Sequence, residues 1–237
     1  MEYSAYKFRI YPTKEQEQSF AQFFGAKRWV YNHFLSENKT RYSNHEKHLS
    51  NFDINKLITT RKREEETSWL KAIDDWCLKN ASEDLSNAYQ QFFNSIKGKR
   101  KGPKLKAPKF KNKHSQQSYR TRGIKVDFSN GTVFLPKIKN VKCVFHRQFD
   151  GKIKSATVSK TPSGKFFVSI LVEGETKLLP TTGKEVGIDL GLKDLMILSN
   201  GIKFQHPETM LAKAKLALKQ QQKLLSRKTR GSNNYHK

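Results

Sequence analysis

Acidic residues are scarce in this sequence, and over one long stretch they are missing altogether. Lysine and arginine outnumber them by 46 to 21, which gives a formal net charge of +25. From Lys97 to Val126 there are 12 lysines and arginines but no aspartate or glutamate. A positive field of this strength attracts polyanions, and contacts between cationic side chains and phosphates give affinity for nucleic acid of any sequence. The charge balance therefore favours nucleic acid as the partner.

Cysteine and long apolar runs are also scarce. Cys77 and Cys143 form no CxxC pair and have no histidine at zinc-ligand spacing, so the sequence predicts neither a disulfide framework nor a zinc site, and it fits a reducing cytoplasm. No apolar run reaches the length of a membrane span. The N-terminal MEYSAYKFRIYP alternates instead of forming a signal-peptide core. We therefore expect neither secretion nor a membrane partner.

The beginning of the chain predicts a strand and then helix. Residues 6–11 alternate between polar and apolar side chains and stop at Pro12, as a strand does. Thr13, followed three residues later by Gln16, is a capping box that opens a helix. Gly25 then ends or bends this helix, and a second aromatic-rich helix follows. Two short helices separated by glycine resemble a helix-turn-helix, although an ordinary helical hairpin explains the pattern as well.

Further helices are predicted up to Ile96. Residues 53–66 predict a charged helix, and an amphipathic segment begins at Trp69. Apolar residues recur there at intervals of three and four, which is the period of a helix with one buried face. We interpret these stripes as core positions and not as a cofactor site.

Beyond residue 122 the period changes from helical to alternating. Asn130-Gly131 lies between two alternating runs, which is the strongest short hairpin signal. At least five short strands with tight turns indicate a small barrel or sandwich. These strands are predicted at 124–128, 133–135, 141–145, 152–160 and 165–173. Because strand 6–11 precedes the helices and belongs to the same barrel, residues 14–96 are predicted to be a helical insertion in it.

An extended basic strip, residues 97–122, separates the helices from the strands. Charge runs of this kind are often only solvated tails. Here Phe110 and Tyr119 interrupt the basic residues, as they do in grooves that follow a nucleic-acid backbone and stack its bases. We therefore prefer nucleic-acid contact. The contacts are predicted at Lys104, Lys106, Lys109, Lys111, Lys113, Tyr119, Arg120 and Arg122.

The last part of the chain places one carboxylate inside an apolar run. After a linker at 178–183, three strands are predicted at 185–190, 194–199 and 202–205, followed by a basic helix from Glu208. Asp189 lies within the first of these strands, in GIDLGL. It is either a metal ligand at a nuclease site or a solvated turn residue, and the turn interpretation suits Asp194 better.

Several segments in a fixed order resemble the TnpB (OrfB) family, the RNA-guided nucleases of bacterial insertion sequences. YKFRIYPTKEQ and GAKRWVYNHFL lie near the start, followed by EETSWL and NAYQQFF. GPKLKAPKFKNK and QSYRT lie in the basic strip, and GIDLGLKDLMILSNG and SRKTRGSNNYHK complete the series. No single segment is decisive, but the order and spacing together make the resemblance specific.

The resemblance implies an α+β fold. A small antiparallel WED-type β-barrel would be split by a helical REC bundle and followed by an incomplete RNase H-like (RuvC) segment. This order agrees with the one predicted above from periodicity. The implied bounds are 1–12 for the first barrel strand, 13–96 for the REC-like insertion with its helix-turn-helix, 97–122 for the basic strip, 123–178 for the barrel and 184–237 for the RuvC segment.

By the same resemblance, Asp189 is the first catalytic carboxylate and a Mg²⁺ ligand. Such cleavage uses two metal ions, and Mg²⁺ requires several hard oxygen ligands. The family's later glutamate and aspartate, and its zinc ribbon, have no counterpart here, since Asp194 and Glu208 do not match them. We therefore expect a chain truncated within RuvC that does not hold Mg²⁺ stably and does not cut DNA alone. Strand 185–190 would form an open sheet edge, suited to self-association or to a complementing chain.

The resemblance also implies the partners, which are guide RNA and double-stranded target DNA in the bacterial cytoplasm, at the nucleoid. It points to Asn51, Trp76 and Lys79 for the duplex that flanks the target, with sequence left mostly to base pairing. The predicted function is thus the nucleic-acid-binding portion of an RNA-guided DNA endonuclease. Three alternatives stay open: an active nuclease completed by another chain, a nuclease-dead RNA-guided regulator, and a basic RNA chaperone or ribosome-associated protein.

Overall fold

The structure, a computed structural model, describes residues 2–114, 117–175, 182–205 and 207–236. The chain forms two compact units, Met1–Lys177 and Leu178–Lys237, and each is described by itself. The predicted linker at 178–183 lies mostly outside the described residues.

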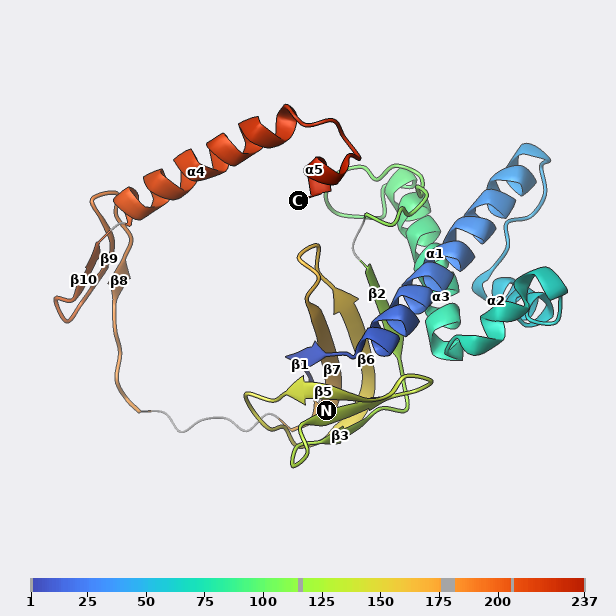
Figure 1. Cartoon of the computed structure of the whole chain (residues 1–237), viewed down its shortest axis with the longest axis horizontal. Helices are drawn as coiled ribbons and strands as arrows, with labels where there is room; N and C mark the ends of the chain where they lie inside the picture. The colour runs from blue at the N-terminus through green and yellow to red at the C-terminus, as the bar shows by residue number, and fades with distance from the viewer. Residues whose placement is uncertain (1, 115–116, 176–181, 206, 237) are drawn as a thin grey trace. The chain divides into compact units, whose positions relative to one another are not determined.

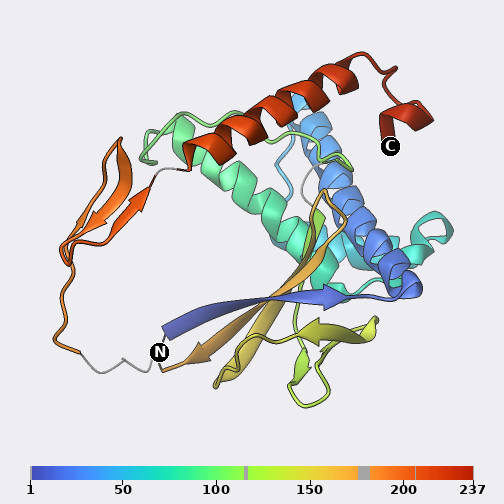
Figure 2. The same ribbon diagram turned by 60° about the vertical axis from the view of Figure 1, so that its left-hand side comes forward.

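The first unit contains a seven-stranded antiparallel sheet in the order β2-β6-β7-β1-β5-β4-β3. The N-terminal strand β1 lies near its centre, between β7 and β5, while β2 and β3 form the two edges. The sheet curls into a half-barrel (Figures 1 and 2). The strands are β1 (Glu2–Tyr11), β2 (Gln117–Thr121), β3 (Lys125–Asp127), β4 (Thr132–Leu135), β5 (Lys139–Val144), β6 (Lys152–Lys160) and β7 (Phe166–Gly174).

Alternating burial explains why these segments form strands. In β7 every second side chain, from Phe166 to Val172, points into the core and is buried. A period of two is what a sheet with one covered face requires. The hairpin predicted at Asn130-Gly131 is confirmed, because β3 and β4 pair across it. Gly131 has a φ of 60°, a left-handed conformation that glycine adopts without steric cost.

The sequence prediction missed the strand β2. Residues 117–121 were assigned to the basic strip, but they pair with β6 from Gln117↔Lys160 to Thr121↔Ala156. The segment QSYRT has no apolar alternation that would reveal it. Only the pairing partner, 35 residues or more further along the chain, makes it a strand. As a result Tyr119 points into the core.

The helical insertion between β1 and β2 begins with α1 (Lys14–Ser43). The predicted capping box is confirmed, since Thr13 and Gln16 cap each other's backbone. The predicted break at Gly25 is wrong, because α1 continues through it as one helix of 30 residues. Glycine inside a helix costs only about 1 kcal/mol. Buried aromatic side chains on both sides of it, such as Phe24 and Phe34, hold the helix against the rest of the unit.

Three further helical segments complete the insertion. They are α2 (Asn51–Arg61), the 3₁₀ segment η1 (Glu65–Ala72) and α3 (Asp75–Ile96). The charged helix predicted over 53–66 therefore ends earlier, and the segment around Trp69 is a 3₁₀ turn. Helices α1 and α3 pack side by side (Figure 1). The buried Cys77 thiol of α3 donates to the Phe23 carbonyl oxygen of α1, 3.6 Å away.

The second unit is a small three-stranded sheet followed by helices. The sheet has the order β10-β9-β8, with β8 (Ile188–Asp189) at one edge. The strand predicted at 185–190 is therefore reduced to two ladder residues. A hydrogen bond from the Gly187 N–H to the Ser199 side chain continues the contact. The other elements are β9 (Asp194–Leu198), β10 (Lys203–Gln205), the predicted helix α4 (Glu208–Ser226) and α5 (Asn233–His236). Within the described ranges, no helix is long and apolar enough to cross a membrane.

Candidate nucleic-acid interface

The basic strip lies against α1 and is fixed there at Lys111. The Asn32 side-chain amide donates to the Lys111 carbonyl oxygen, and Asn32 Oδ1 accepts the Lys111 N–H, both at 2.8 Å. Nearby, the Lys39 ammonium lies 4.4 Å from the ring centre of Phe110, which is half exposed. Around Lys111 the strip is thus an irregular segment held in a defined place, and the alternative of a solvated tail does not describe it there.

The ammonium group of Lys111 makes its contacts within the protein. Its Nζ lies 3.9 Å from the ring centre of Tyr31 and 3.6 Å from the Asp84 carboxylate, which also pairs with Lys27 at 2.9 Å. Burial lowers the pKa of Lys111, and Asp84 opposes this effect. Of the other predicted contacts in the strip, Lys104, Lys106, Lys109 and Lys113 are exposed. These four side chains are available to phosphates, as is the exposed Arg122 described below.

Tyr119 does not lie on this surface, and its prediction as a stacking residue is wrong. Its side chain is fully buried against Phe20, Phe23 and Phe24 of α1, with ring centres 5.2 to 6.2 Å away. It points inward because β2 joins the sheet and alternate residues of a strand face opposite sides. Desolvation raises the pKa of the Tyr119 hydroxyl well above its ordinary value. Tyr119 is a core residue that connects the sheet to α1.

Three residues predicted on different grounds meet around one indole ring. Trp76 and Lys79 lie on the first turns of α3, and Arg122 follows β2. The Arg122 guanidinium lies 4.0 Å from the Trp76 ring centre, and the Lys79 ammonium lies 5.3 Å from it. Trp76 is half-buried, whereas both cations are exposed. The indole therefore holds two positive charges at the surface, where they can meet phosphate oxygens.

Arg120 and Asn51 extend this site along α3. The Arg120 Nε donates to Asn80 Oδ1 (2.7 Å), and its guanidinium pairs with Glu83 (2.7 Å). Asn51 Oδ1 accepts a hydrogen bond of 2.7 Å from the Ser82 hydroxyl, which joins α2 to α3. Asn51, Trp76, Lys79, Arg120 and Arg122 thus surround the N-terminal half of α3, and we call this group the α3 cluster.

Two hollows with basic walls lie beside the strip. The smaller, of about 290 Å³, is lined by Phe24, Lys27, Arg28, Asp84, Lys111, Asn112, Gln117 and Ser118. The larger, of about 720 Å³, includes Lys7, Lys113, His114 and Lys160. We call them the basic hollows. Arg28 lines both of them, and its guanidinium donates to Gln117 Oε1 (3.3 Å).

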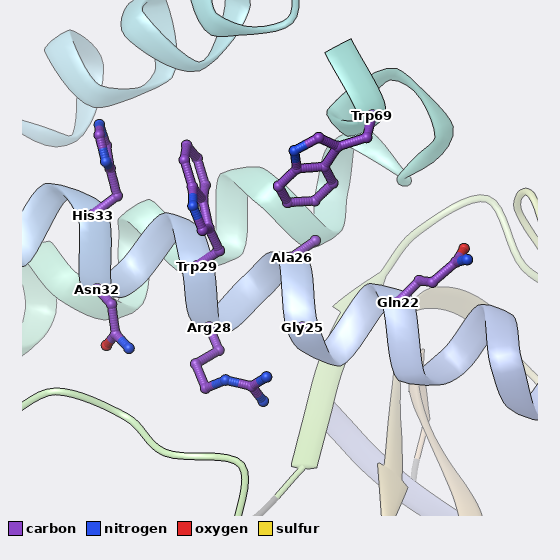
Figure 3. Close-up of a pocket in the computed structure, with 8 residues that line it drawn as sticks. All are labelled: Gln22, Gly25, Ala26, Arg28, Trp29, Asn32, His33 and Trp69. Atoms are coloured by element: carbon purple, nitrogen blue, oxygen red, sulfur yellow. The ribbon is translucent and has the colours of Figure 1, made fainter. Parts of the chain in front are cut away.

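A third hollow, of about 600 Å³, runs along α1 and has aromatic walls (Figure 3). We call it the aromatic groove. The Trp29 and His33 rings stack 4.7 Å apart, and Trp69 of η1 meets Trp29 edge to face at 5.6 Å. Its remaining lining is Gln22, Gly25, Ala26, Arg28 and Asn32. The sequence prediction missed this groove, although Trp29 and His33 stand four residues apart, the spacing that places side chains on one helix face.

The predicted metal ligand, Asp189, belongs to the second unit. Asp189 is exposed on β8 and pairs with Ile197 of β9. In the part of the chain that the structure describes, no three histidine, cysteine or acidic side chains gather as a ligand set. These residues therefore do not fit a two-ion magnesium centre by themselves. The two cysteines are free and buried, and burial raises the pKa of the Cys143 thiol to about 12.

Comparison with known proteins connects both ends of the chain to one family. Residues 1–47 match the helix-turn-helix domain of IS605-type OrfB proteins, and residues 169–237 match their "Probable transposase" domain. The "Putative RNA-guided DNA endonuclease InsQ" of Escherichia coli K12 is 32% identical over 98% of this chain. The chain belongs to the TnpB/OrfB family.

Two further proteins align with all or part of the chain. A "Putative RNA-guided DNA endonuclease" of Streptomyces pristinaespiralis is 30% identical over 98% of the chain. The "Virulence protein VsdF" of Salmonella dublin is 36% identical over 47% of the chain and 95% of its own length. The chain spans 56% and 57% of the two endonucleases, so it corresponds to a little over half of each. A cryo-EM structure of a Cas12f1–sgRNA–target DNA complex aligns with 94% of this chain and 62% of its own, at 13% identity and a TM-score of 0.38.

Proposed function

We propose that this chain is the RNA- and DNA-binding portion of an RNA-guided DNA endonuclease. The observation that carries the proposal is that the fold itself fixes cationic side chains of the strip at the surface. Asn32 holds the strip on α1 at Lys111, and the Arg122 guanidinium lies over the Trp76 ring of the α3 cluster. A surface of cations set in place by the fold suits a polyanion of fixed shape better than a disordered tail would.

In this proposal the elements take the roles that the family resemblance implies. The half-barrel corresponds to the WED domain, the helical insertion to the REC domain and the second unit to the start of a RuvC domain. Lys104, Lys106, Lys109 and Lys113 contact phosphates of the guide RNA or of its duplex with DNA. Such contacts position the nucleic acid without reading its sequence. The α3 cluster contacts the duplex that flanks the target.

Asp189 has a separate role in the proposal, as one carboxylate of the family's nuclease site. Its place on β8, away from any gathered ligand set in the described ranges, means that further oxygen ligands have to come from elsewhere. Together with such ligands, the Asp189 carboxylate would help to hold a divalent ion, and that ion would supply charge stabilisation for phosphodiester cleavage. The chain itself contributes the strand that orients this one carboxylate.

The test is a binding experiment with the RNA that copurifies with the chain from its host. After that RNA is sequenced, duplex DNA that matches its guide segment is compared with scrambled duplex DNA of the same length. We expect tight DNA binding only with RNA present and only for the matched duplex. Binding of both duplexes with equal affinity, or binding that does not need RNA, would contradict the proposal. That result would favour a basic RNA chaperone.

A further inference from the structure

Gly25 occupies a position where the fold gives no reason for glycine. It lies in the middle of α1, and glycine there weakens a helix relative to alanine. A Cβ atom built on Gly25 would meet nothing closer than the Arg28 guanidinium, 3.9 Å away. No neighbouring element therefore requires position 25 to be without a side chain. A side chain there would instead enter the aromatic groove, since Gly25 is part of its lining (Figure 3).

The walls of the groove suit a flat aromatic ligand. His33 lies almost parallel to Trp29, with an angle of 10° between the rings, while Trp69 stands at 79° to Trp29. Trp69 is 42% exposed, so much of its surface is available to a ligand. Nucleobases stack on such rings whatever their sequence, because every base has a π face.

Arg28 joins the aromatic groove to the basic hollows. It is the residue that lines all three, and Lys27, Lys111, Lys113 and Lys160 lie around the other two. A stacking surface next to a cationic track is the arrangement by which proteins hold single strands, with bases on the rings and phosphates on the cations. The charges around the groove therefore complement a nucleotide better than an uncharged aromatic ligand.

We propose that the aromatic groove binds an unpaired base of the RNA that this chain carries. The base stacks on Trp29 or Trp69 over the floor that Gly25 leaves open, and the adjoining phosphates lie in the basic hollows. This inference rests on the proposed function, in which a guide RNA offers unpaired nucleotides while the target DNA arrives as a duplex. The groove is then a single-strand site distinct from the α3 cluster.

Substitutions at position 25 change the groove while the fold stays intact. Gly25→Leu fills the groove, and Gly25→Ala is the matched control that adds only a Cβ atom. Both substitutions improve helix propensity. We therefore expect both proteins to fold, and Gly25→Ala to melt about 2–4 °C higher than the natural chain. Trp69→Ala removes one wall of the groove and serves as an independent second variant.

The probe is a ten-nucleotide single-stranded RNA of mixed sequence, compared with a duplex RNA of the same length. Loss of one stacked base is expected to weaken single-strand binding about tenfold in Gly25→Leu and in Trp69→Ala. Duplex binding should stay within about twofold of the natural chain, and Gly25→Ala should weaken single-strand binding less than Gly25→Leu does. The slope of log affinity against log salt should not change, because no phosphate contact is lost.

Three outcomes would overturn the inference. Gly25→Leu and Trp69→Ala could bind single-stranded RNA as the natural chain does. They could lose single-strand and duplex affinity equally. They could lose affinity for single-stranded DNA of the same sequence while RNA binding stays intact. A natural chain that binds no RNA at all would instead refute the proposed function, so the two failures are distinguishable.

Discussion

The Asn32 side chain brackets the backbone of Lys111, accepting its N–H and donating to its carbonyl oxygen at 2.8 Å each. One amide thus satisfies both polar groups of a peptide segment 79 residues further along the chain. It does for the strip what a neighbouring strand does in a sheet. This single contact places the basic residues on either side of Lys111 against α1.

Asn32→Ala should therefore release the strip. Two part-buried hydrogen bonds are lost, each worth about 0.5–1.5 kcal/mol, so we expect a loss of stability of about 1–2 kcal/mol. The sharper measurement is limited trypsin digestion, since the strip is rich in lysine and arginine. Cleavage within residues 104–113 should become several times faster. Gln18→Ala, at an exposed position of the same helix, is the control, and equal cleavage rates in the two variants would contradict the prediction.

Tyr119 should behave as a core residue and not as a binding residue. Its hydroxyl is buried and has no hydrogen-bond partner among the described residues. Tyr119→Phe should therefore be neutral or stabilise the fold by up to about 1 kcal/mol, because an unsatisfied polar group is removed. Tyr119→Ala should destabilise it by about 3–5 kcal/mol. Chemical denaturation measures both changes, and weaker RNA binding by a fully folded Tyr119→Phe would reverse the assignment.

The two cations on Trp76 should act as phosphate contacts. Arg122→Ala and Lys79→Ala are each expected to weaken binding of all sequences and to reduce the slope of log affinity against log salt by about one. Trp76→Phe keeps an aromatic surface for the cations and should lose less than Trp76→Ala. Lys125→Ala, at an exposed position of β3, is the control for net charge. A loss confined to particular DNA sequences would instead mean that Arg122 or Lys79 reads bases.

Stability should fall as the pH drops below neutral, because of two half-buried histidines, His33 and His48. Burial lowers the pKa of His33, and the Arg61 guanidinium lowers it further, while Glu37 and Glu64 oppose the shift. Burial also lowers the pKa of His48. Both values lie below the ordinary 6.5, so the unfolded chain takes up protons first as the pH falls through 6.5. The stabilising contribution is thus complete above that pH and is lost below it.

Melting temperatures measured between neutral pH and pH 5 test this sign. His48→Phe keeps a ring against Tyr89, whose centre lies 4.2 Å away, and should flatten the dependence on pH. His114→Phe replaces an exposed histidine and should leave the profile as it is. A melting temperature that rises on acidification through this range would show that the pKa shifts have the opposite direction.

The sequence also predicts that this 237-residue polypeptide does not cut DNA by itself. Two magnesium ions about 4 Å apart need several oxygen ligands, and Asp189 is one. The measurement incubates the chain, its copurified RNA, matched duplex DNA and Mg²⁺, beside the variant Asp189→Ala. We expect no cleavage from either protein, and cutting that disappears in Asp189→Ala would contradict the prediction.

Local signals were sufficient for most elements of the fold. The capping box at Thr13 and the turn at Asn130-Gly131 each depend on residues a few positions apart, so a short stretch of sequence is enough to predict them. Gly25 and Tyr119 were misjudged because distant segments decide their environments. A long helix packed on both sides of Gly25 overrides the local break, and pairing with β6 turns Tyr119 inward.

The candidate site follows the same division. Net charge and the acid-free strip predicted a nucleic-acid surface that includes Arg122, and the family resemblance pointed separately to Trp76 and Lys79. Arg122 lies over the Trp76 ring because β2 passes beside α3. No residue spacing in the sequence predicts this packing. The aromatic groove was missed because its second wall, Trp69, comes from a 3₁₀ turn 40 residues beyond Trp29.

The place of β1 in the half-barrel sets the order in which the chain can fold during synthesis. Glu2 to Ile10 pair with residues 166–174 of β7. During synthesis, β1 therefore cannot pair with β7 until almost the whole first unit has been made. Pairing over such a separation is slow, because loop entropy is lost before contacts form. The helices can form as soon as they emerge. Until β7 emerges, most of β1 lacks its pairing partner, and that interval is when nascent chains are most exposed to misfolding.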